Sequence, residues 1–149
     1  MHRLVLAVAT CTLALAFGAA AAEPVTASAA WIRATPPGAR TAAAYLTLTS
    51  GSAADRLLGA TTPAARAVEI HTHVAENGMH RMVPLAELPL PPDEAVRLEP
   101  GALHLMLIDL AAPLEAGARV TLSLRFAAAE TLELEVPVVD ARAASPDPP

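Results

Sequence analysis

The sequence predicts an all-β fold: an antiparallel β-sandwich of the Greek-key type with about eight or nine strands, or a small barrel built from the same strands. Short runs of aliphatic, β-branched and aromatic residues recur along the chain, and turn residues such as Gly, Pro, Asn and Asp separate them. In the last two runs, apolar residues occupy every second position, which is the period of a half-buried strand. The 149 residues suffice for one domain with a core.

The first 22 residues have the layout of a secretory signal peptide, which we expect to be cleaved after Ala22. A short basic start containing Arg3 precedes an apolar run, residues 4–17, and a series of small residues follows. The apolar run is too short to span a membrane comfortably, so we expect no stable membrane insertion after cleavage. Lipid attachment at Cys11 is not expected, because Thr10 precedes this cysteine and the apolar stretch before it is short.

The predicted domain covers residues 23–139. The turn segments TPPG, SGSAAD and ENG lie between its first candidate strands, which are residues 26–33, 43–49, 56–59, 66–75 and 79–83. Its later strands are separated by LPLPPDE, EPG and EAG; they are residues 95–98, 102–109, 118–126 and 131–139. The alternation is clearest in two sets of core-facing residues: Val120, Leu122, Leu124 and Phe126, then Leu132, Leu134 and Val136. The polar, Pro-rich tail, residues 140–149, is expected to be disordered.

The composition excludes several classes of protein. Cys11 is the only cysteine, so the cleaved chain has no disulfide, no thiolate nucleophile and no cysteine ligand for a zinc or blue-copper site. Every basic residue is arginine, which excludes a lysine nucleophile. Arg3 is the only charged residue of the first 22, so cleavage changes the net charge from −5 to −6. This acidity argues against nucleic acid as a partner.

All histidines and methionines that follow residue 22 lie between positions 71 and 106; they are His71, His73, Met79, His80, Met82, His104 and Met106. Residues Asn77 and Gly78 are the strongest short-range signal for a two-residue hairpin turn. Such a turn pairs Glu76 with Met79 and His73 with Met82, and it places His71 opposite Pro84, diagonal to Met82 on the same face. The hairpin thus brings two histidines and one methionine into one patch.

The segment GALHLMLID, residues 101–109, supplies a second pair of candidate ligands. As a strand it places Leu103, Leu105 and Leu107 on one face, and His104 and Met106 on the other. Thioether sulfur is a soft, neutral ligand that suits Cu(I) and holds Zn(II), Mg(II) or Ca(II) poorly. The set therefore indicates a Cu(I) site. We interpret Met79 and His80 as bystanders and leave His73 open as a third imidazole ligand or a neighbour.

Ten residues separate His71 from Met82, twenty-one separate Met82 from His104, and one separates His104 from Met106. This spacing resembles the motif of the periplasmic copper chaperones called PCu(A)C. Further segments of the chain are similar to blocks of that family: AWIRATPPGARTAAAYLTLTSG, VEIH, GMHRM, EPGALHLMLIDL and PLEAGARVTLSLRF. The resemblance covers about residues 28–138. It implies a cupredoxin-like β-sandwich in the periplasm that binds one Cu(I) through His71, Met82, His104 and Met106.

The resemblance also implies a carrier rather than an enzyme. Members of the family are associated with copper delivery to the dinuclear copper centre of cytochrome c oxidase, sometimes together with a Sco-type thiol protein. Some members have a His/Met-rich C-terminal extension with a Cu(II) site. The tail of this chain contains neither residue, so that second site is not expected unless His73 and His80 provide one.

Competing functions make different demands on the residues. A cupredoxin electron carrier requires a cysteine ligand, and a histidine-brace monooxygenase requires an N-terminal histidine where Glu23 is expected. The main alternative is a periplasmic Cu(II) or Zn(II) buffering or resistance protein that uses the His-rich hairpin through Glu69, His71, His73 and His80. A metal-free interaction module is the remaining alternative.

Overall fold

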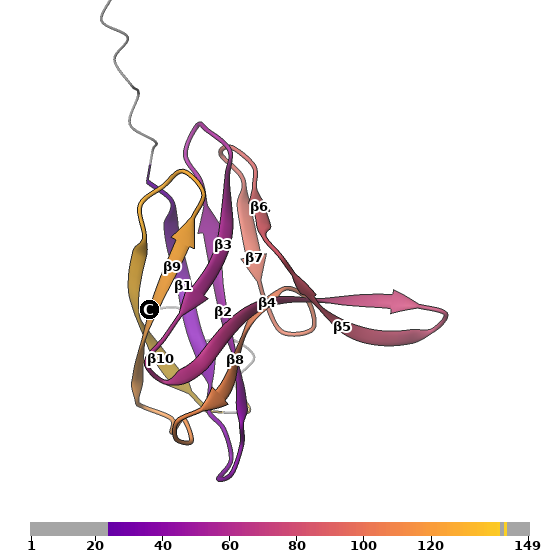
Figure 1. Cartoon of the computed structure of the whole chain (residues 1–149), viewed down its shortest axis with the longest axis vertical. Helices are drawn as coiled ribbons and strands as arrows, with labels where there is room; N and C mark the ends of the chain where they lie inside the picture. Colours follow the sequence, from indigo (N-terminus) through magenta and orange to yellow (C-terminus); the bar gives the residue numbers. More distant parts are fainter. Residues whose placement is uncertain (1–23, 141, 143–149) are drawn as a thin grey trace, which may run out of the picture.

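The computed structural model describes residues 24–140 and residue 142, and these residues form ten β-strands and no helix (Figure 1). The all-β prediction is confirmed. The strands are β1 (Thr26–Arg33), β2 (Thr41–Thr49), β3 (Asp55–Thr61), β4 (Ala65–Glu76), β5 (Met79–Leu85), β6 (Leu88–Leu90), β7 (Ala95–Leu98), β8 (His104–Leu110), β9 (Arg119–Phe126) and β10 (Leu132–Val139). Within this part of the chain, no helix is long and apolar enough to cross a membrane. The predicted signal peptide lies outside the described residues, as does most of the predicted tail.

Seven of the strands close into a barrel. Each pairs with the next in the order β4, β8, β2, β1, β10, β9 and β3, and a pairing of Ala60 with Val68 joins β3 back to β4. The other three strands extend the barrel: β5 is paired to β4, β6 to β3 and β7 to β2. Strands β1 and β10 run parallel, whereas the other pairs are antiparallel.

Of the two predicted architectures, the structure shows the small barrel: seven strands form a closed barrel with three additional strands, in place of a sandwich of eight or nine antiparallel strands. Alternation could not separate the two architectures, because every second residue faces inward both in a sandwich and in a small barrel. Strand β6 was not predicted. It has only three residues, and Pro89 at its centre is typical of a short edge strand rather than of a central one.

The core lies inside the barrel and consists of aliphatic side chains together with Phe126. The predicted inward face of β9 is confirmed, since Val120, Leu122, Leu124 and Phe126 are all buried. In β8, Leu105 and Leu107 are completely buried and belong to this core. The alternation of the strand therefore directs His104 and Met106 to the outer face of the barrel.

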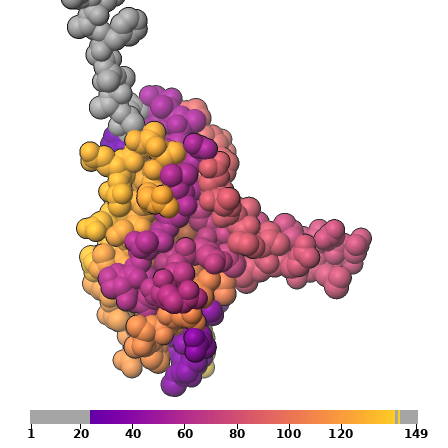
Figure 2. Space-filling view, in the orientation of Figure 1, coloured from indigo at the N-terminus to yellow at the C-terminus, as the bar shows by residue number. Residues whose placement is uncertain are grey.

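The outer part of β4 and strand β5 form a two-stranded arm that projects from the barrel, as the ribbon and the space-filling view both show (Figures 1 and 2). The predicted turn and register are confirmed: Asn77 and Gly78 have φ angles of 52° and 77°, and Glu76 pairs with Met79. Strand β4 pairs with β8 only as far as His71, and from there to its end it pairs with β5 alone. The histidine positions of β4 thus lie where the arm leaves the barrel.

Candidate metal site

Two histidines lie side by side on the outer face of the barrel. His71 of β4 and His104 of β8 are direct cross-strand partners, and their ring centroids are 5.8 Å apart. Both are largely buried, with 9% and 5% of their surface exposed. Met106 lies two residues along β8 on the same face, opposite Glu69 of β4. The structure therefore brings together three of the four predicted ligands and adds a carboxylate beside them.

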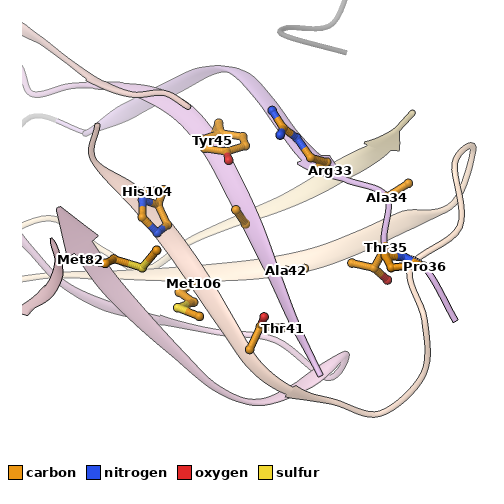
Figure 3. A pocket seen from close by; sticks show the side chains of 11 residues that line it. Arg33, Ala34, Thr35, Pro36, Thr41, Ala42, Tyr45, Met82, His104 and Met106 are labelled. Atoms are coloured by element: carbon orange, nitrogen blue, oxygen red, sulfur yellow. The ribbon is translucent and has the colours of Figure 1, made fainter. Parts of the chain in front are cut away.

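Met82 reaches this group from the arm. It pairs with His73 in the predicted register, and the His73 ring lies 5.5 Å from that of His104, measured between centroids. Met82, His104 and Met106 line one hollow of about 320 Å³ on the surface (Figure 3). Met82 is 43% exposed. The site thus combines well-packed imidazoles with a thioether that solvent and an incoming ligand can reach.

One hydrogen bond of the His104 ring fixes its tautomer. Its Nδ1 lies 3.1 Å from the carbonyl oxygen of Ala102, and because a carbonyl only accepts, Nδ1–H is the donor. The lone pair of the neutral ring is then on Nε2. Burial lowers the pKa of His104 below its ordinary value. The hydrogen bond to the Ala102 carbonyl acts to raise this pKa, and positive charge on His71 or His73 would lower it further. His104 is therefore neutral at neutral pH, as a metal ligand must be.

His71 is held by a different contact. Its Nε2 lies 2.8 Å from a carboxylate oxygen of Glu69. Its Nδ1 is buried and has no hydrogen-bond partner among the described residues. Buried polar atoms without a partner are rare in folded proteins, because each loses its hydration without compensation. A metal ion would be a suitable partner for this nitrogen.

The remaining candidates lie apart from this group. Met79 is 71% exposed beside the turn of the arm, and His80 next to it is exposed as well. Among the residues that the structure describes, no group of three or more His, Asp or Glu side chains is arranged to hold a metal ion. The buffering alternative needs Glu69, His71, His73 and His80 to act together, and His80 is exposed on the arm. His73 is near the site, and its role stays open.

Sequence reasoning missed the aromatic pair beside His104, Trp31 and Tyr45. The rings of Trp31 and Tyr45 lie 4.5 Å apart, and the Tyr45 ring lies 6.4 Å from that of His104. The Arg33 guanidinium lies over both rings, at 5.8 Å and 5.9 Å. None of these residues belongs to the core inside the barrel. The two rings lie together because the register of β1 and β2 pairs Trp31 with Tyr45. This register could not be predicted from the sequence alone.

The fold and the position of the site define the class of this protein as a β-barrel of the PCuAC type. The copper-bound PCuAC domain from PmoF2 has a TM-score of 0.68 with this chain at 23% identity, and the match covers 81% of this chain and 97% of that domain. Apo-DR1885 from Deinococcus radiodurans is 30% identical, with a TM-score of 0.60 over 94% of this chain and 95% of its own. CuI-DR1885 is 34% identical, with a TM-score of 0.61 over 79% of this chain and 80% of its own.

The family itself follows from the sequence comparisons. Residues 25–138 match the family described as Putative lipoprotein LpqE-like, and this chain belongs to the LpqE-like family. Putative lipoprotein Lxx21020 from Leifsonia xyli subsp. xyli is 37% identical over 120 residues, which are 80% of this chain and 72% of that protein. The resemblance to PCu(A)C proteins that the motif indicated is thus confirmed.

Proposed function

We propose that this protein is a copper chaperone that carries one Cu(I) ion on His71, Met82, His104 and Met106. The observation that carries the proposal is the pair of facing imidazoles, His71 and His104, beside two thioethers. Each imidazole has a nitrogen lone pair that is not engaged in a hydrogen bond within the described part of the chain. The proposal is supported by the copper-bound form of the PmoF2 domain and by the Cu(I)-bound form of DR1885.

The donor set suits transport better than permanent storage or catalysis. Two neutral imidazoles and two neutral thioethers bind soft Cu(I) and discriminate against Zn(II) and Mg(II). None of these four ligands is anionic, so an acceptor with cysteine thiolates forms a more stable copper complex. The exposed position of Met82 gives such an acceptor a ligand to displace first. We therefore propose a carrier without enzymatic activity.

The substitution of two ligands on one strand tests the site. His104→Ala with Met106→Ala should abolish tight Cu(I) binding, because half of the donors are lost. The aliphatic face of β8 stays intact, so the barrel should still fold. Competition with a chromogenic Cu(I) chelator measures the affinity, and circular dichroism checks the fold. Binding as tight as in the parent would show that copper lies elsewhere.

A screen of metals separates the carrier from the buffering alternative. Under reducing conditions we expect one tightly bound Cu(I), and under oxidising conditions we expect weaker binding of Cu(II) and Zn(II). The reverse preference would favour a buffering protein that uses the hairpin histidines. A protein purified from copper-supplemented cells without any metal, and unaffected by chelators, would favour an interaction module.

We further propose that the chaperone works in the periplasm and delivers copper to the dinuclear copper centre of cytochrome c oxidase, together with a Sco-type thiol protein. The description of its relatives as lipoproteins adds a second form of the N-terminus, in which a lipid on Cys11 anchors the chain. The mass of the protein isolated from its host distinguishes the two. We expect a chain that begins at Glu23. The mass of a chain with a lipid on Cys11 would show instead that the protein is anchored to the membrane.

A further inference from the structure

We infer that His71 binds copper through Nδ1 whereas His104 binds it through Nε2, and that Glu69 is the positioning residue that imposes this difference. The inference rests on the proposed Cu(I) site and specifies its donor atoms. It starts from the contact between Glu69 and His71, two residues apart on the same face of β4, with Oε2 and Nε2 separated by 2.8 Å.

The contact determines which nitrogen of His71 is free. An ionised carboxylate only accepts hydrogen bonds, so the proton of the neutral ring must be on Nε2, and the lone pair is on Nδ1. That same Nδ1 is the atom that is buried without a hydrogen-bond partner in the described part of the chain. The carboxylate therefore occupies one nitrogen of His71 and leaves the other for an ion.

His104 is arranged in the opposite way. The carbonyl of Ala102 accepts from Nδ1–H of His104 and leaves Nε2 as its donor atom. Because the two histidines are cross-strand partners, the free nitrogens belong to neighbouring rings. Nδ1 lies nearer to its own main chain than Nε2 does, so an ion bound to both rings lies closer to β4 than to β8. This position favours access for Met82, whose strand β5 pairs with β4.

Glu69 also affects the strength of the copper bond. A carboxylate that accepts a hydrogen bond from a ligand histidine orients the ring and makes it a better electron donor. Glu69 lies opposite Met106 in the β4–β8 register, so its charge is also near the second pair of ligands. Its side chain is 48% exposed, and its removal opens no cavity in the core.

The nitrogen resonances of the imidazoles test the inference directly. In the ¹⁵N-labelled protein, one equivalent of Cu(I) should shift Nδ1 of His71 and Nε2 of His104, while Nε2 of His71 and Nδ1 of His104 remain protonated. A shift of Nε2 of His71 in place of Nδ1 would overturn the inference and leave the proposed site intact. No response of either histidine would overturn the proposed function itself.

Substitutions then assign the effect to Glu69. Glu69→Ala should weaken Cu(I) binding by about 10- to 100-fold, the range known for groups that support metal ligands, and both tautomers of His71 should appear in the copper-free protein. Glu69→Gln should restore most of the affinity, because its amide oxygen can still accept from Nε2–H.

Glu76→Ala is the matched control. Glu76 is on the same strand and carries the same charge, but it is exposed at the outer end of the arm, where it pairs with Met79. Its substitution should leave the affinity and the His71 tautomer unchanged. Equal losses of affinity in Glu69→Ala and Glu76→Ala would assign the effect to overall charge and overturn the positioning role. Full affinity in Glu69→Ala would also overturn the positioning role.

Discussion

His104 combines two properties that are seldom found together: it is almost fully buried, yet it lies outside the core. The alternation in β8 predicted its face correctly, because Leu105 and Leu107 on the other face are completely buried. The sequence did not predict its burial. That burial depends on Tyr45 from β2 and His71 from β4, which become its neighbours only through the pairing of distant strands.

The lowered pKa of His104 predicts how copper binding depends on pH. Imidazole binds copper only when neutral, and burial moves the protonation of His104 below its ordinary value of 6.5. The contribution of His104 to the Cu(I) affinity should therefore change little on lowering the pH to about 6.5, and then fall by about tenfold per unit once His104 is protonated. Competition titrations across this range measure the profile. A marked loss above pH 6.5 would contradict the prediction.

The same shift affects the stability of the copper-free protein. The folded state holds a proton on His104 less readily than the unfolded chain, so the free energy of unfolding is highest above pH 6.5 and falls as the pH decreases through the lowered pKa. Urea unfolding at a series of pH values measures this change. In His104→Gln the contribution of this residue to the pH dependence should vanish.

At the scale of the element, the β4–β5 hairpin was predicted in detail. A two-residue turn of Asn and Gly fixes the register of both strands, so the pairing of His73 with Met82 followed from the turn alone. The projection of the hairpin as an arm did not follow. It arises because β8 stops pairing with β4 at His71, which is a property of the closed barrel rather than of the hairpin.

The arm allows a matched test of its two methionines. Met82→Ala removes a thioether beside the hollow and should lower the Cu(I) affinity on the order of tenfold or more, a loss in the range known for metal-site residues. Met79→Ala makes the same change on the same strand, but at a position exposed near the turn, and should leave the affinity unchanged. His80→Ala should behave like Met79→Ala. A loss in the Met79 variant as large as in the Met82 variant would place copper further out on the arm.

At the scale of the whole molecule, the barrel divides the site into a fixed half and an accessible half. His104 and Met106 belong to β8, which pairs with β2 on one side and β4 on the other, so their backbone is held on both sides. Met82 belongs to β5, which among the described strands pairs only with β4. Local sequence patterns indicated the four candidate ligands but not this division, because it depends on which strands close the ring and which remain outside it.

This division predicts the course of copper transfer. An acceptor with two cysteines, such as a soluble copper domain of the oxidase, should displace Met82 first and then take the ion from the imidazoles, because thiolates bind Cu(I) more strongly than neutral ligands. Mixing the Cu(I)-loaded protein with the reduced domain and separating the two should show nearly complete transfer. A serine-substituted domain should take none. Met82→Ala should release copper faster than the parent. Copper that stays with this protein although the acceptor cysteines are reduced would contradict delivery to this class of partner.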